Sequence, residues 1–198
     1  MDLFELFSIF IGVSLVHNFI FCQFLGLCPY IGVTERTSSA VGMGMAVIFV
    51  MTLTSAITWA VYEWVLVPCG ITYLYIIAFI LVIAAFVQLV EMFLQKSVPA
   101  LYRALGIYLP LITTNCAVFG VVTLNKIELF GTTNSLLKCI VQGFGGGAGF
   151  MLAMLIMAGI RERLEMADVP EALKGMPIAL ITAGLTAIAF LGFSGLSI

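Results

Sequence analysis

The feature that most constrains this chain is its division into apolar segments long enough to cross a lipid bilayer. Hydrophobic residues make up 63% of the 198 and charged residues only 9%, and the mean hydropathy is +1.21. Soluble domains carry about 25% charged residues. We therefore expect an integral membrane protein with no soluble domain, which leaves water-soluble substrates to other subunits.

Cutting the sequence at charges and turn residues gives six candidate spans, each close to or above the roughly 20 residues that a transmembrane helix needs. They are Leu3–Val33, Ser38–Tyr62, Ile71–Leu94, Ala104–Leu124, Leu136–Ile160 and Met176–Leu196. The segments are apolar on all sides, as expected for membrane helices rather than surface helices. The predicted fold class is all-α, with six transmembrane helices.

The basic residues are unevenly divided between the two ends of these spans. The loops after the first, third and fifth spans share one side of the membrane, and they contain Arg36, Lys96, Arg103, Arg161, Arg163 and Lys174. The other side holds only Lys126 and Lys138. The positive-inside rule then predicts that the basic loops are cytoplasmic and that both termini lie outside.

The chain forms one membrane domain that divides near Pro99 into two halves, 1–98 and 99–198, with three spans each. Three is an odd number, so the halves have opposite orientations and are predicted to be inverted repeats with interrupted helices near the midplane. Each half also contains the pattern Cys-x-x-apolar-Gly-Val, starting at Cys28 and at Cys116. The second span of each half is rich in glycine, which favours close helix packing.

The two repeated cysteines are predicted to lie at similar depth. Cys28 precedes the charged residue Glu35 by seven positions, a rise of about 10 Å along a helix. Cys116 precedes Lys126 by ten positions, or about 15 Å. Half of the hydrocarbon core is also about 15 Å thick, so both thiols should lie near its centre, approached from opposite faces.

The first span is too long for one straight helix, since it runs for 31 residues from Leu3 to Val33. A strong tilt, an interfacial start or a break must absorb the excess length. Gly26 and Pro29 flank Cys28 closely and favour a break there. The polar run Thr113-Thr114-Asn115 stands in the matching place before Cys116. Irregular backbone at membrane depth should face the protein interior, a cavity or a partner.

A single cysteine in a membrane span is most simply a small buried hydrophobe. Duplication in one pattern at one depth favours metal ligation instead, chiefly an iron–sulfur cluster, which usually takes four cysteine thiolates. A second chain must then supply two more ligands, while zinc and a disulfide stay open as alternatives. Cys22, Cys69 and Cys139 lie outside the pattern and receive no role.

Other polar residues have simpler interpretations. His17 and Asn18 lie inside the first span, where polar groups are costly and need partners. For His17, a hydrogen bond within the helix packing is favoured over a role in a relay. Arg161, Glu162 and Arg163 are expected to anchor the fifth span at the cytoplasmic surface.

At the cysteine motifs and several further stretches, the sequence closely resembles the Rnf–Nqr family of membrane proteins, and within it the A subunits of Rnf complexes. The resemblance covers essentially the whole chain. It is carried by Phe24–Pro29 (FLGLCP), Gly42–Ala46 (GMGMA), Leu105–Val118 (LGIYLPLITTNCAV), Gly159–Leu164 (GIRERL), Asp168–Pro170 (DVP) and Ile178–Leu185 (IALITAGL).

The resemblance implies a six-helix protein that pairs with a homologous membrane protein of inverted topology, the E subunit of the Rnf complex. Such a pair holds one [2Fe–2S] cluster in the membrane, and the family's ligand positions match Cys28 and Cys116 as two of the four ligands. Other Rnf subunits would carry flavin and iron–sulfur cofactors. The complex, in the bacterial cytoplasmic membrane, would couple electron flow from reduced ferredoxin to NAD with Na⁺ or H⁺ translocation, and this chain would hold no complete active site.

Three alternatives remain at this point. The E subunit of the sodium-pumping NADH:quinone oxidoreductase is the nearest sibling, although Pro29 and the pair Thr113-Thr114 look more like the Rnf version. A self-contained secondary transporter would also have inverted repeats and broken helices, but no acidic residue lies clearly in the middle of a span. A structural scaffold would tolerate replacement of both cysteines.

Overall fold

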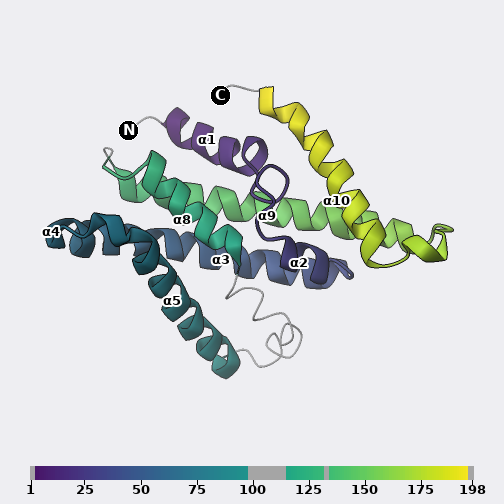
Figure 1. Ribbon diagram of the computed structural model, residues 1–198, viewed down its shortest axis with the longest axis horizontal. Helices are drawn as coiled ribbons and strands as arrows, with labels where there is room; N and C mark the ends of the chain where they lie inside the picture. Colours follow the sequence, from purple (N-terminus) through teal and green to yellow (C-terminus); the bar gives the residue numbers. More distant parts are fainter. Residues whose placement is uncertain (1–2, 98–114, 132–133, 196–198) are drawn as a thin grey trace.

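A computed structural model describes residues 3–97, 115–131 and 134–195, and all regular structure in these ranges is helical. Figure 1 shows α3 and α9 lying side by side, with α1 and α8 next to them, whereas α5 and α10 diverge from this pair. The elements are α1 (Leu3–Ile11), η1 (Gly12–Val16), α2 (Leu27–Gly32), α3 (Thr37–Val61), η2 (Tyr62–Leu66), α4 (Val67–Cys69), η3 (Thr72–Leu74), α5 (Tyr75–Ser97), α8 (Cys116–Glu128), α9 (Ser135–Glu165), η4 (Glu171–Leu173), α10 (Met176–Phe190) and η5 (Leu191–Gly195).

The described helices fit a membrane protein. Four helical stretches are long and apolar enough to cross a bilayer: Thr37–Cys69, Thr72–Met92, Ser135–Glu165 and Met176–Phe193. They correspond to the second, third, fifth and sixth predicted spans, with ends that differ by a few residues. The all-α membrane fold is thereby confirmed, while the six-span inverted repeat stays a prediction.

The fourth predicted span falls largely on residues 98–114, which lie outside the described residues together with the proposed boundary near Pro99. Its described part is α8, which begins at Cys116 and continues to Glu128, four residues beyond the predicted end. The orientation of the termini across a membrane also stays a prediction.

The first predicted span is broken, as the glycine and proline around Cys28 predicted. The apolar helix Phe4–Val16 ends in a π-helical turn, residues 17–26 are irregular, and the chain becomes helical again at Leu27. The break therefore precedes Cys28, and Pro29 lies within the first turn of α2. Proline is tolerated there because an amide in the first turn has no partner inside the helix.

The central pair α3 and α9 is antiparallel and packs through glycine. A Cβ at Gly147 would stand 2.7 Å from Ile48 Cα, and a Cβ at Gly44 would stand 2.6 Å from Met151 Cγ. Any larger residue would push these backbones apart, so the packing interpretation of the glycines is confirmed at these positions. Gly42, by contrast, has nothing within 4 Å of its Cβ position.

A second glycine face of α9 receives the first segment of the chain. A Cβ at Gly149 would stand 2.5 Å from Ser14 O, and one at Gly145 would stand 3.1 Å from a ring atom of Phe10. The fifth predicted span is therefore enclosed by α3 on one face and by α1 and η1 on another. This arrangement places the irregular segment 17–26 against the middle of α9.

Candidate functional site

Cys28 lies in the first turn of α2, directly after the break in the first segment. The N-cap of this helix is Gly26, which has a left-handed backbone with φ 79° and ψ 27°. Glycine adopts this conformation without the steric cost of a Cβ. The Cys28 side chain is exposed on the surface of this chain.

Cys116 is the first residue of α8, whereas Cys28 is the second residue of α2. Its N-cap is Asn115, whose Oδ1 accepts a hydrogen bond from the Ala117 amide at 3.0 Å. Asparagine is among the strongest N-capping residues, so the local sequence explains why the helix begins here. Cys116 is also exposed. Both copies of the cysteine motif thus place their cysteine in the first turn of a helix and at the protein surface.

The two halves meet at these helix starts. The Gly26 amide donates a hydrogen bond to Cys116 Sγ at 3.0 Å, although the residues are 90 positions apart. A Cβ at Gly26 would stand 2.4 Å from the Phe150 ring and 3.0 Å from Asn115 Oδ1. The second cysteine therefore lies against the backbone two residues before the first, and glycine is required at this contact.

Asn18 holds the irregular segment in place through both ends of its amide. Nδ2 donates to Gly149 O at 2.8 Å and to Ser14 O at 3.1 Å, and Oδ1 accepts from the Ile20 amide at 3.0 Å. Asn18 is fully buried. The packing hydrogen bond predicted for His17 is not observed among the described residues, where His17 is exposed, whereas its neighbour Asn18 makes such bonds.

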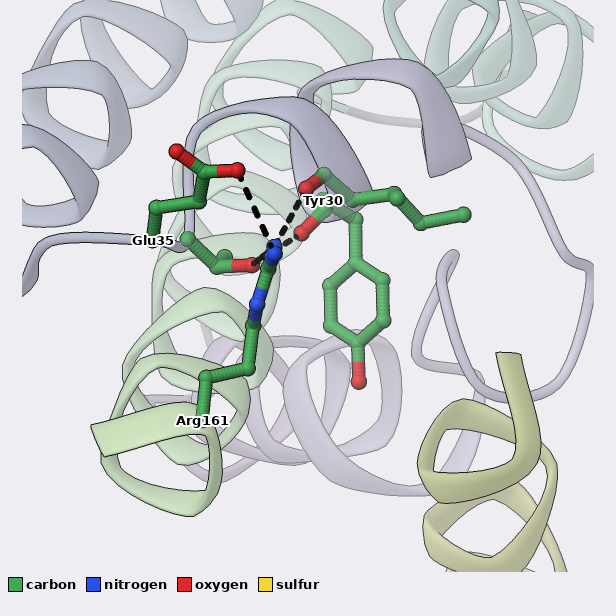
Figure 2. A network of polar contacts seen from close by, with 5 residues as sticks. Tyr30, Glu35 and Arg161 are labelled. Carbon is green, nitrogen blue, oxygen red and sulfur yellow. Dashed lines mark hydrogen bonds and ion pairs between the residues drawn. The ribbon is translucent and has the colours of Figure 1, made fainter. Parts of the chain in front are cut away.

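Arg161 closes the other end of the cysteine-bearing helix α2 (Figure 2). Its guanidinium donates to Ile31 O at 2.6 Å and to Thr34 Oγ1 at 3.3 Å, and it lies 3.4 Å from Glu35 Oε1. The last carbonyls of a helix lack intrahelical partners, so a cation there is favourable. Sequence reasoning treated Arg161 as a surface anchor and missed this cap. The available signal was an arginine at the end of the glycine-rich span.

A pocket lies along α2 and is lined both by Cys28, near the start of the helix, and by Arg161, at its end. It has a volume of about 500 Å³ and is lined by Leu27, Cys28, Ile31, Gly32, Glu35, Arg161, Gly175 and Met176. One wall comes from α2 and its neighbour α9, and the other from the start of α10. The exposed thiol and the charged pair thus share one opening.

The described residues contain no group of three or more His, Cys, Asp or Glu side chains that could hold a metal. A four-thiolate centre that used Cys28 and Cys116 would need its other ligands from outside this chain. The remaining cysteines differ in setting: Cys139 is buried, Cys69 is exposed, and Cys22 Sγ donates to Val16 O at 3.1 Å. The structure adds no role for them.

Comparison with known proteins agrees with this arrangement. A family model described as "Rnf-Nqr subunit, membrane protein" matches residues 6–197, nearly the whole chain. This chain belongs to the Rnf-Nqr family. The resemblance seen in the sequence is thereby confirmed, and the helix starts at Cys28 and Cys116 lie within the matched region.

Several relatives carry names that state a function. One, from Acetobacterium woodii, is the A subunit of a Na(+)-translocating ferredoxin:NAD(+) oxidoreductase complex, 55% identical over 190 residues that cover 96% of this chain and 97% of the relative. The A subunit of an ion-translocating oxidoreductase complex from Pectobacterium carotovorum is 54% identical over 95% of both chains. A relative of the same name from Azoarcus is 52% identical over 98% of both chains.

Proposed function

We propose that this chain is the A subunit of an ion-translocating ferredoxin:NAD oxidoreductase complex of the Rnf type. Relatives with names of this kind align with it from end to end at more than half identity. In this proposal the chain carries electrons through the bacterial cytoplasmic membrane and takes part in Na⁺ or H⁺ translocation. Because the aligned relatives are named as A subunits, the Rnf assignment is favoured over the sibling E subunit of the sodium-pumping NADH:quinone oxidoreductase.

Cys28 and Cys116 are proposed to supply two of the four ligands of a [2Fe–2S] cluster. The observation that carries this proposal is the hydrogen bond from the Gly26 amide to Cys116 Sγ. It brings the two repeated motifs into contact, and amide hydrogen bonds to sulfur are one means by which proteins set cluster potentials. Both cysteines also lie at helix starts, where the partial positive charge of the helix favours an anion.

The chain's own residues determine where the two cysteine ligands lie. Gly26 and Asn115 fix where the two cysteine-bearing helices begin, and Arg161 fixes where the first of them ends. When bound, the cluster would supply one-electron transfer. Because both thiols are exposed on this chain, the partner subunit and the bilayer would have to exclude water from the site; a low local dielectric would then strengthen the hydrogen bonds to sulfur.

The remaining two ligands are proposed to come from a homologous membrane protein of inverted topology, the E subunit of the same Rnf complex. Both thiols are exposed on this chain, and a partner subunit that supplies the other two ligands would cover them in the assembly. Flavin and iron–sulfur cofactors on other Rnf subunits would deliver and accept the electrons. Both termini of this chain are proposed to lie on the outer side of the membrane.

The test uses the assembled complex with Cys28→Ser or Cys116→Ser. Each substitution should remove one [2Fe–2S] signal from the electron paramagnetic resonance spectrum and lower the iron content by about two per complex. Cys69→Ser is the matched control because Cys69 is also exposed and ends a short helix. An assembled variant at Cys28 and Cys116 with unchanged iron and spectrum would overturn the proposal.

A further inference from the structure

Four buried polar side chains lie on the helices that meet where α8 ends and α9 begins. Thr54 and Ser55 come from α3, Asn125 from α8 and Gln142 from α9, and each is 0% exposed. Buried polar groups in an apolar protein need partners, because unpaired groups are costly in a low dielectric. This cluster lies apart from the cysteine-bearing helix starts, at the opposite end of α8 from Cys116.

The antiparallel register of the helices places these side chains at one level. A Cβ at Gly143 would stand 2.6 Å from Ser55 Oγ, so the adjacent Gln142 lies level with Thr54 and Ser55. Gln142 Nε2 donates to Glu128 Oε2 at 3.3 Å, and Glu128 lies one helical turn after Asn125. Gln142 thus links the polar residues of α3 to those of α8.

Most of the polar atoms in this cluster have no partner among the described residues. The unpaired atoms are Thr54 Oγ1, Ser55 Oγ, Gln142 Oε1, and both Oδ1 and Nδ2 of Asn125. The contrast with nearby threonines is informative. Thr52 Oγ1 donates to Ile48 O at 2.7 Å, and Thr123 Oγ1 donates to Phe119 O at 2.9 Å. Thr54 and Ser55 do not make this usual intrahelical bond, which leaves their oxygens free for another ligand.

The charges around the cluster favour a cation. Glu128 is exposed at its edge, and no basic side chain among the described residues pairs with it. The two lysines nearest in sequence are engaged elsewhere, since Lys138 Nζ lies 2.5 Å from Glu5 and Lys126 Nζ lies 4.0 Å from the centre of the Tyr75 ring. A cation entering from this end would meet an unneutralised carboxylate first.

We propose that Thr54, Ser55, Asn125 and Gln142 form a binding site for a small monovalent cation of the sodium class, entered past Glu128. Hydroxyl and amide oxygens are hard ligands that suit such ions, and the single neighbouring carboxylate matches a single positive charge better than a divalent one. The proposal deepens the proposed function, because the site would serve ion translocation in the same subunit. The alternative occupant is ordered water, which also satisfies buried polar groups.

The experiment measures equilibrium binding of radioactive Na⁺ to the purified, assembled complex, with choline as the background cation. Thr54→Val removes one unpaired oxygen with little change of shape, and Asn125→Leu removes another. Each should weaken one class of Na⁺ site by about tenfold or more, as expected when a polar partner of an ion is lost. Thr52→Val is the matched control on the same helix, because its hydroxyl is already bonded, and it should leave Na⁺ binding unchanged.

Unchanged Na⁺ affinity and stoichiometry in both variants would show that water alone fills the cluster and would overturn the proposal, as would an unmodified complex that binds no Na⁺. If Asn125→Leu fails to assemble, Na⁺ binding by the near-isosteric Thr54→Val variant tests the proposal. Thr54→Ser keeps a hydroxyl group and should bind Na⁺ like the unmodified complex. The cluster spectrum is recorded on the same samples. A lost Na⁺ site with an intact [2Fe–2S] signal supports this inference, whereas loss of Cys28 or Cys116 without spectral change counts against the proposed function alone.

Discussion

The Gly26 amide donates its hydrogen to Cys116 Sγ at 3.0 Å, and this bond joins the break in the first segment to the start of α8. The contact depends on a left-handed backbone at Gly26 and on the absence of a side chain beside Phe150. The position of each helix start therefore depends on the other. The relationship ties the irregular segment before Cys28 to the non-helical N-cap Asn115 before Cys116.

Gly26→Ala should destabilise the protein and disturb the cysteine site. The added Cβ would stand 2.4 Å from the Phe150 ring and would occupy a left-handed conformation. Together these effects should cost about 2–4 kcal/mol. We expect a lower unfolding temperature and an altered or missing cluster signal. Gly42→Ala, in a helix with open space around the new Cβ, should have neither effect.

Arg161→Met should loosen the end of α2 while keeping the apolar stem of the side chain. The lost bond from the guanidinium to Ile31 O is charge-assisted and should be worth about 1.5–3 kcal/mol. We expect a shifted cluster potential in redox titration and a less stable complex. Arg163→Met is the control, because Arg163 is exposed. Equal effects of the two substitutions would contradict a capping role.

Glu35→Gln should have a small effect by comparison. The Glu35 side chain is 67% exposed and its Oε1 lies 3.4 Å from Arg161, whose own side chain is 17% exposed. Solvent-exposed ion pairs contribute about 0–1 kcal/mol. The unfolding temperature of this variant should therefore stay near that of the unmodified complex. A loss as large as that of Arg161→Met would show that the ion pair, rather than the carbonyl cap, holds α2.

Asn18→Leu should destabilise the irregular segment 17–26, which lies between η1 and α2. Asn18 makes three hydrogen bonds of 3.1 Å or shorter in a fully buried position, and their loss leaves backbone groups of Gly149 and Ile20 without that partner. We expect a loss of about 2–4 kcal/mol and faster proteolysis of residues 17–26 in the membrane. Gln23→Leu, an exposed residue in the same segment, should be tolerated. Normal protease resistance in Asn18→Leu would contradict the assigned role.

Gly147→Ala should separate the central helices. Its Cβ would stand 2.7 Å from the backbone of Ile48, where no side-chain rotation can relieve the contact. Overpacking of this kind costs about 1–3 kcal/mol. We expect lower yield and a lower unfolding temperature of the complex. Gly159→Ala, on the same helix with nothing within 4 Å of the new Cβ, should be neutral or slightly stabilising. The prediction fails if both variants behave alike.

The sequence by itself determined the features that depend on local composition and chain length. Apolar segments of sufficient length indicated the membrane helices. Gly26 and Pro29 indicated a break beside Cys28 in the first segment, which is too long for one straight span. The polar run Thr113-Thr114-Asn115 predicted irregular backbone before Cys116, and the described helix α8 begins at Cys116. The family was also recognisable from the motifs around Cys28 and Cys116.

Only the tertiary structure decided which distant residues meet. The bond from Gly26 to Cys116, the cap of α2 by Arg161 and the unpaired cluster around Asn125 join residues from separate helices. Segments that are apolar on every side carry no periodic signal for which face turns inward, so many rotations and registers are equally compatible with the sequence. Helix backbones can approach closely only where glycines face each other's helix, and this requirement leaves one register. In that register some polar side chains lie beside a partner and others do not.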